Sequence, residues 1–370
     1  MTSFTRDSSI RKGLDSTWNW LKRLVTTETF LYVVKRLLQG ILTLFLASAL
    51  SFAIIQLAPG DYLDTLRQNP KISPETIKNY REQFGLDKPA IEQYRRWLWQ
   101  IIKPQIVKPS PFLPPLVVPN GNFGTSFVYN RSVSSLLWER IPATLLMAIA
   151  SILVTWAIAI PLGIIAAVNQ NRIFDRFLQV ISYAGQGFPS FITALLLLIL
   201  AQYTSPLFPV GGMTSINNAD LSAIGKVLDI GWHLILPTIA LSITSFAGLQ
   251  RITRGEMLDV LRQDYIQTAR AKGLPENRVI YVHALRNAVN PLVTLLGFEF
   301  ASLLSGAFIA EFFFNWPGLG RLILSAVTAQ DLYLVMASLM MGALMLIVGN
   351  LLADLLLKAV DPRIRLENLK

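Results

Sequence analysis

The sequence has no cysteine, only two histidines and few charged residues, and each shortage excludes a class of chemistry. Without cysteine there can be neither disulfide bonds nor thiolate metal sites. His233 and His283 lie far apart, and neither has a metal-ligand neighbour at helical spacing, so no metal site is predicted. No G-x-x-x-x-G-K-[ST] motif is present, which excludes nucleotide binding through a P-loop. With no catalytic residue to propose, the sequence argues against an enzyme.

Apolar residues are abundant where charged residues are few. Hydrophobic residues make up 52% of the chain and charged residues 15%, and the mean hydropathy is +0.46. Apolar runs of about 20 residues indicate membrane-spanning helices, because hydrocarbon offers the backbone no outside hydrogen-bond partner. We therefore predict an all-α polytopic membrane protein with about six transmembrane helices. The six runs cover residues 37–57, 143–168, 178–203, 233–249, 292–313 and 335–357.

The distribution of Lys and Arg predicts the orientation in the membrane. Nine basic residues lie in the loops after the second and fourth spans, and only Lys226 and Arg321 lie in the short loops on the other side. Basic residues in short loops stay in the cytosol. Both tails, 1–36 and 358–370, are therefore predicted to be cytoplasmic. The net charge of +10 is spread over tails and loops, where orientation and lipid headgroups explain it, so the bilayer and not nucleic acid is the expected partner.

The first external loop, residues 58–142, is the largest polar region. Ser73, followed by a proline, marks a helix start and Gly85 a helix stop. A second amphipathic helix is predicted after Pro89, lying along the outer membrane surface. The proline-rich run 104–119 is expected to be an extended, semi-rigid spacer without chemistry of its own.

Two polar residues inside the spans are candidates for a translocation path. Glu299 lies about two turns into the fifth span, where a charge facing lipid is costly. It is expected to face a neighbouring helix or a water-filled path, and a hydrogen-bonded packing residue is the alternative. Gln186 in the third span can line a polar passage or bridge two helices.

The stretch NWPGLG at 315–320 follows the fifth span and contains turn residues. Its proline and glycines allow a sharp change of backbone direction at the outer end of the span. We hypothesise that it shapes the external mouth of a path, and simple loop closure is the alternative. The residues concerned are Pro317, Gly318, Leu319 and Gly320.

A polar, mostly basic segment separates the fourth and fifth spans. Residues 256–272 are predicted to form a helix that ends at Gly273, because glycine reaches the left-handed conformation of a helix C-cap. Leu274 can fold back on the last turn, Pro275 prevents continuation, and a second helix is predicted for 275–287. The result is a helical hairpin with small residues beside its turn, which invite contact by another protein. A solvated connector is the alternative, although connectors are usually much shorter.

Several stretches together resemble the permease subunits of bacterial ABC importers, in the branch that takes up di- and oligopeptides. The resemblance covers nearly the whole chain. Here the general importer pattern E-A-A-x-x-x-G appears as QTARAKG, which departs from it at Gln267 and Thr268 in a way that is typical of the peptide branch. The proline-rich insert before NFGTSF is also longer than usual. The matching stretches are QLAPGD at 56–61, FGLDKPAIEQYRRWL at 84–98, NFGTSF at 122–127, TARAKGL at 268–274, HALRNAVNPL at 283–292 and EFFFNWPGLGRL at 311–322.

The resemblance implies a mechanism and a set of partners. The chain would form a translocation path with a sister permease in the bacterial plasma membrane, within a permease core at 143–357. Two cytosolic ATPase subunits would bind ATP and Mg, so that this chain itself holds no cofactor, and an external binding protein would deliver the solute. The large first loop resembles that of the first of the two peptide permeases. Segment 251–290 would be the coupling loop seated in an ATPase, with contacts from Asp264, Tyr265, Thr268, Ala269, Arg270, Ala271, Lys272, Gly273 and Leu274.

Two other classes of function compete with this interpretation. An ion-coupled secondary transporter would use Glu299 as its coupling group, but an inverted repeat is missing and the cytosolic hairpin is elaborate. A sensor or scaffold would not transport at all. The sequence leaves the solute open among dipeptides, oligopeptides, nickel complexes, glutathione and opines.

Overall fold

The computed structural model describes residues 27–57, 60, 62–67, 72–107 and 116–360. Most of the N-terminal tail, the C-terminal residues 361–370 and the centre of the proline-rich run therefore lie outside the described residues. So do three residues of the QLAPGD stretch, at 58, 59 and 61.

Within these ranges five helices are long and apolar enough to cross a membrane, and six when a bent pair is counted as one span. The prediction of an all-α polytopic fold is thus confirmed. The helices extend past the apolar runs, because a helix continues into polar residues once it leaves the hydrocarbon. The spans are α2 (Thr27–Leu57), α6 (Val133–Val168), the pair α7 (Ile173–Gly187) and α8 (Ser190–Tyr203), α9 (Ala223–Leu261), α12 (Leu285–Phe313) and α14 (Leu332–Val360).

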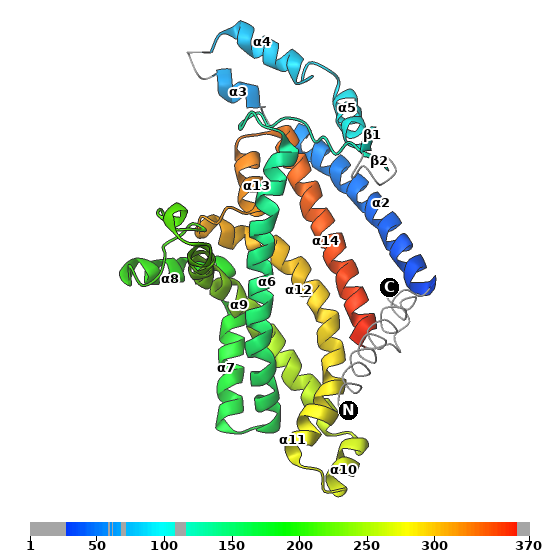
Figure 1. Cartoon of the computed structure of the whole chain (residues 1–370), viewed down its shortest axis with the longest axis vertical. Helices are drawn as coiled ribbons and strands as arrows, with labels where there is room; N and C mark the ends of the chain where they lie inside the picture. The colour runs from blue at the N-terminus through cyan, green and yellow to red at the C-terminus, as the bar shows by residue number, and fades with distance from the viewer. Residues whose placement is uncertain (1–26, 58–59, 61, 68–71, 108–115, 361–370) are drawn as a thin grey trace, which may run out of the picture.

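The spans form an elongated bundle in which α6 and α9 pack along much of their length, with α7 beside them (Figure 1). Gly163 on α6 permits this approach, since a Cβ there would lie 2.7 Å from the Cβ of Thr253 and 2.9 Å from the carbonyl oxygen of Gln250. On the other side, α14 packs between α12 and α2. The short helix η1 (Asn218–Asp220) precedes α9.

The third span is not the continuous helix predicted for 178–203. Helices α7 and α8 meet at an angle of 100°, so that α8 projects sideways from the bundle (Figure 1). Pro189 explains the break, because proline removes a backbone donor and disfavours helical backbone at the preceding residue. Phe188 accordingly has extended dihedrals, φ −88° and ψ 119°.

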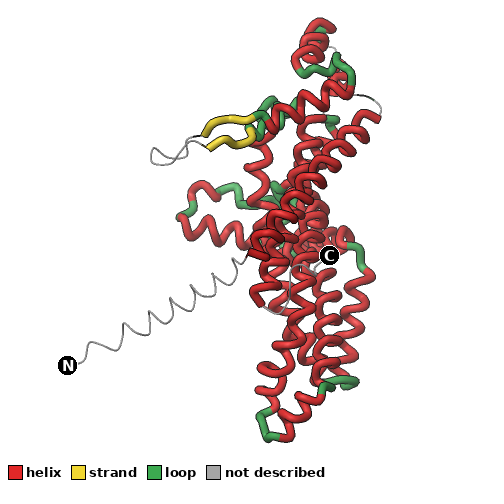
Figure 2. Tube along the Cα trace, turned by 90° about the vertical axis from the view of Figure 1, so that its right-hand side faces the viewer, coloured by secondary structure: helices red, strands yellow, loops and turns green. Residues whose placement is uncertain are grey.

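The first loop folds, with the two predicted helices, into a small domain at the end of the bundle opposite residues 264–278, and we call these the outer domain and the outer end (Figure 1). These are α4 (Pro74–Gln83), whose N-cap Ser73 accepts a hydrogen bond from the Thr76 N–H, and α5 (Ala90–Ile102), preceded by α3 (Tyr62–Arg67). The proline-rich run is more regular than the spacer predicted for it. It contains an antiparallel pair, β1 (Pro104–Val107) with β2 (Leu116–Pro119), which projects from the side of the molecule (Figure 2).

Asp331 holds the outer domain against the first turn of α14. Its fully buried carboxyl group accepts hydrogen bonds from Ser126 Oγ at 2.6 Å and from the Val128 N–H at 3.1 Å. It also caps α14 by accepting from the Leu334 N–H at 3.2 Å. Burial raises the pKa of Asp331, and the hydrogen bond from Ser126 opposes that shift. This contact ties the NFGTSF stretch to the last span.

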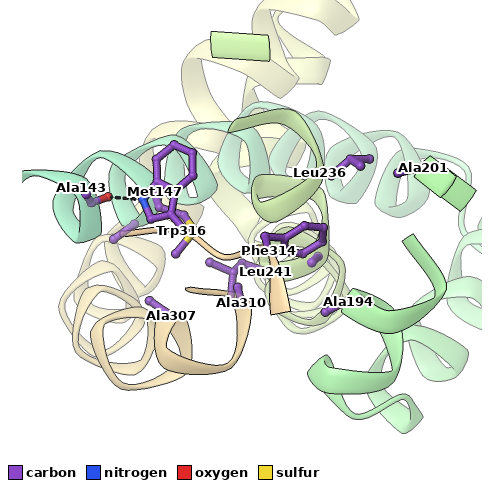
Figure 3. Packing of buried hydrophobic residues seen from close by; sticks show 12 residues of the cluster. Ala143, Met147, Ala194, Ala201, Leu236, Leu241, Ala307, Ala310, Phe314 and Trp316 are labelled. Atoms are coloured by element: carbon purple, nitrogen blue, oxygen red, sulfur yellow. Dashed lines mark hydrogen bonds between the residues drawn. The ribbon is translucent and has the colours of Figure 1, made fainter. Parts of the chain in front are cut away.

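A core cluster near the outer end of the bundle joins α6, α8, α9 and α12 (Figure 3). Phe314 and Trp316, which follow α12, are its largest fully buried side chains. The indole N–H of Trp316 donates to the Ala143 carbonyl of α6 at 2.9 Å, so its polar atom is satisfied within the core.

Candidate functional site

The hairpin between the fourth and fifth spans is built from more pieces than the sequence predicted. The helix expected at 256–272 is interrupted, because α9 ends at Leu261 and α10 (Asp264–Ala271) starts after the extended Gln263. The second helix begins with α11 (Glu276–Arg278) and the π-helix η2 (Val279–Ala284), which leads directly into α12. No glycine or proline marks either irregularity, so tertiary packing sets them.

The predicted turn at Gly273 is confirmed in its geometry. Gly273 has φ +74°, and a Cβ there would meet no atom within 4 Å, so backbone conformation and not crowding favours glycine. The Leu274 N–H donates to the Ala269 carbonyl at 3.3 Å, which closes the helix end. Arg270 and Glu276 form an ion pair of 2.7 Å across the turn. The turn is thus closed by contacts within the chain itself.

The hairpin packs on the spans through one face and leaves the other free. Ile266 and Ala269 belong to a buried cluster with Met257 of α9 and Ile164 of α6. Ala269 therefore packs inward, which corrects the prediction that it presents a small surface beside the turn. Leu274 is half-buried. The other residues predicted for the ATPase contact are exposed: Asp264, Tyr265, Thr268, Arg270, Ala271, Lys272 and Gly273.

A buried ion pair joins the helix that leads into the hairpin to the third span. The Arg254 guanidinium donates to both carboxylate oxygens of Asp175, at 2.6 and 2.8 Å. The Asp175 side chain is fully buried, and the Asn171 N–H and the Gln179 amide also donate to it. Such bidentate, multiply bonded pairs are geometrically specific. Helices α7 and α9 are consequently clamped together at the end of the bundle that carries the hairpin.

The loop after the fifth span is held by a third buried carboxylate, that of Glu311. Glu311 is fully buried and accepts hydrogen bonds from Thr144 Oγ1 of α6 at 2.6 Å and from the Arg321 N–H at 3.0 Å. Thr144 Oγ1 in turn accepts from the Leu319 N–H at 2.7 Å, at the start of α13 (Leu319–Thr328). Gly318 lies directly against the carboxylate. The residues predicted for the external mouth thus surround a Glu311 network that fixes them to α6.

The two path candidates lie in different surroundings. Glu299 Oε2 accepts the indole N–H of Trp156 at 2.6 Å, and Ser245 of α9 lies beside the carboxyl group. Its Oε1 is buried without a partner of good hydrogen-bond geometry in the described part of the chain. This contact favours the packing alternative for Glu299. Gln186 is exposed at the end of α7.

Sequence reasoning missed three carboxylates that organise these sites: Asp175, Glu311 and Asp331. Glu311 breaks an apolar run and Asp331 precedes one, so both carried a signal of the kind that identified Glu299. Their partners lie 167 and 205 residues away, which no local pattern reveals. Within the described residues, no group of three or more His, Cys, Asp or Glu is arranged to hold a metal ion.

Together, the spans and the hairpin packed on them are those of a polytopic membrane protein. Residues 159–366 match the family of binding-protein-dependent transport system inner membrane components, and residues 29–148 match its N-terminal part. The chain belongs to this family. It is therefore the permease component of such a transport system and not its ATPase, as the motifs predicted.

Characterised relatives cover almost the whole chain. It is 37% identical over 334 residues to the oligopeptide transport system permease protein AppB of Bacillus subtilis (strain 168). It is 35% identical over 350 residues to the dipeptide transport system permease protein DppB of Escherichia coli (strain K12). Each alignment covers 90% of this chain and 98% of the relative. An inward-facing structure of the MetNI methionine ABC transporter superposes with a TM-score of 0.48 at 15% identity, covering 61% of this chain and 97% of that chain.

Proposed function

We propose that this chain is one of two permeases of an ATP-driven importer for di- or oligopeptides in a bacterial plasma membrane. The observation that carries the proposal is near-full-length similarity to two permeases named for peptide transport. A sister permease completes the path, and an external binding protein delivers the peptide. Both termini of this chain lie in the cytosol.

Coupling to ATP hydrolysis is assigned to the hairpin. Its exposed face, from Asp264 to Gly273, is offered to a cytosolic ATPase subunit, while Ile266 and Ala269 pack on α9 and α6. Two such subunits bind ATP and Mg, and this chain binds no cofactor. What supports the assignment is that the hairpin is packed on two spans, because coupling is carried by contiguous packed contacts.

Reconstitution of the chain with its sister permease, ATPase subunits and binding protein tests the proposal. Vesicles should accumulate a labelled mixture of alanine peptides only with ATP and binding protein, and mass spectrometry of the purified binding protein should identify a peptide ligand. Ionophores should leave uptake unchanged. Uptake that needs an ion gradient and no ATP would instead support the ion-coupled alternative at Glu299. A binding protein that retains a nickel complex, glutathione or an opine would reject the peptide assignment while leaving the permease class intact.

A further inference from the structure

The break between α7 and α8 lies deep in the membrane. Asp175, near the predicted cytosolic boundary, precedes Gln186 by eleven helical residues, a rise of about 16 Å. The hydrocarbon core is about 30 Å thick, so Gln186 lies close to its middle.

The break is also open to its surroundings. Gln186, Gly187, Phe188 and Pro189 are all exposed, and a Cβ at Gly187 would meet no atom within 4 Å. Phe188 has extended backbone, so the helical hydrogen-bond ladder is interrupted here. An exposed primary amide and non-helical peptide groups thus occur together at mid-membrane depth.

Lipid is an unsuitable neighbour for this surface. An unpaired backbone polar group in hydrocarbon costs several kcal/mol, and irregular backbone at this depth is tolerated only against protein or along a water-filled cavity. Helix–helix contacts in membranes favour small side chains that allow close approach. Phe188 at the break is bulky and 51% exposed, so it does not provide a small-residue contact of this kind. A water-filled cavity fits the polar groups of the break.

We infer that residues 186–189 form a wall of the aqueous path, where the Gln186 amide and the carbonyl groups left without a helical partner at the end of α7 hydrogen-bond the backbone of the passing solute. Such a wall supplies hydrogen-bond donors and acceptors together, as the peptide bonds of a solute require. Recognition of this kind does not depend on the side chains of the solute. Phe188 provides an apolar surface beside these polar groups. This inference rests on the proposed function, since it names the solute-contacting surface of the same path.

The absence of cysteine makes a direct accessibility test possible. Gln186→Cys and Gly187→Cys are compared with Leu46→Cys, a matched control on α2 that is 57% exposed and lies ten residues, or about 15 Å, beyond Arg36. Full complexes in lipid nanodiscs are treated with a small charged thiol reagent that does not enter hydrocarbon. We expect the two variants at the break to react on the order of tenfold faster than the control, because only water carries the reagent there.

Two results would overturn the path assignment. Reaction as slow as that of Leu46→Cys, both in the complex and in the isolated chain, would place the break in lipid or in packed protein. Slow reaction in the complex but fast reaction in the isolated chain would place it in the interface with the sister permease.

The solute contact is tested separately by uptake of labelled alanine peptides. Gln186→Leu should reduce uptake on the order of tenfold and Gln186→Asn much less, because the shorter amide keeps a donor and an acceptor. Unchanged uptake by Gln186→Leu would reject the contact. If the unmodified complex takes up no peptide although the labelling pattern holds, the proposed function fails and the path wall stands.

Discussion

Gly318 provides the most direct test of the outer loop, because the smallest possible side chain cannot fit there. A Cβ built on Gly318 would lie 2.0 Å from Glu311 Oε1 and 2.1 Å from its Cδ. The backbone at Gly318 is extended, with φ −96°, so conformation does not demand glycine. Gly318→Ala must therefore displace the Glu311 carboxylate from Thr144 and Arg321.

The cost follows from the bonds that are lost. Hydrogen bonds to a charged group are each worth about 1.5 to 3 kcal/mol, and overpacking a dense core costs about 1 to 3 kcal/mol. Displacing the carboxylate from two donors should thus destabilise the chain by on the order of 3 to 6 kcal/mol and loosen the start of α13. The apparent unfolding temperature should fall by on the order of 5 °C or more. Gly231→Ala is the matched control, because a Cβ at Gly231 meets nothing within 4 Å.

The assay is thermal unfolding of the purified chain in detergent, together with peptide uptake and basal ATPase activity in the assembled complex. If the clash is the cause, Glu311→Ala should already lose the network, and adding Gly318→Ala should cost little more. Additive effects of the two changes, or an unchanged unfolding temperature for Gly318→Ala, would refute the reasoning. Normal uptake and ATPase activity in an assembled Gly318→Val complex would show that the loop does not gate the path.

Three further predictions concern coupling and topology. Gly273→Val should cost about 1 to 2 kcal/mol at the left-handed turn and abolish uptake or retention of the ATPase subunit. Gly273→Asn should preserve both, because asparagine tolerates that conformation. Full transport by the valine variant would mean that the hairpin is only a connector. Asp175→Asn should destabilise the chain by about 3 to 5 kcal/mol, measured as a loss of thermal stability, because it leaves the Arg254 charge unpaired. Adding Arg254→Gln should recover part of that loss. Additive losses of stability in the double variant would argue against the ion pair. Cysteines replacing the exposed residues Thr125 and Asn277 should react from outside and from inside respectively, and reaction of both from one side would contradict the proposed topology.

The sequence predicts those features that depend on local chemistry. Hydropathy located the spans. Capping preferences predicted the Ser73 cap, and periodicity predicted the helix after Pro89. The left-handed turn at Gly273 followed from the properties of glycine. The bend in the third span was missed because a hydropathy window does not register geometry. Pro189 nevertheless carried the signal for it.

What could not be predicted depends on partners distant in the chain. The interruption of the helix at Gln263 occurs where Met257 and Ile266 both pack into the same cluster, so packing overrides a continuous helical pattern. Ala269 could be assigned to the hairpin but not to its buried face. Glu299 could be identified as costly, but its hydrogen bond to Trp156, 143 residues away, could not be predicted.

Helix α6 connects the two ends of the molecule, and this has a consequence for coupling. At the hairpin end Gly163 brings it into close contact with α9, and at the outer end Thr144 binds Glu311. A displacement of the hairpin that moves α6 must therefore also reach the outer loop, because close-packed contacts do not deform gradually. Helix α7 is tied to α9 through the buried Asp175 side chain. The α7 hydrogen-bond ladder ends at Gly187. Helix α8 bends away there, but it packs in the core cluster with α6, α9 and α12, so it is tied to the same unit.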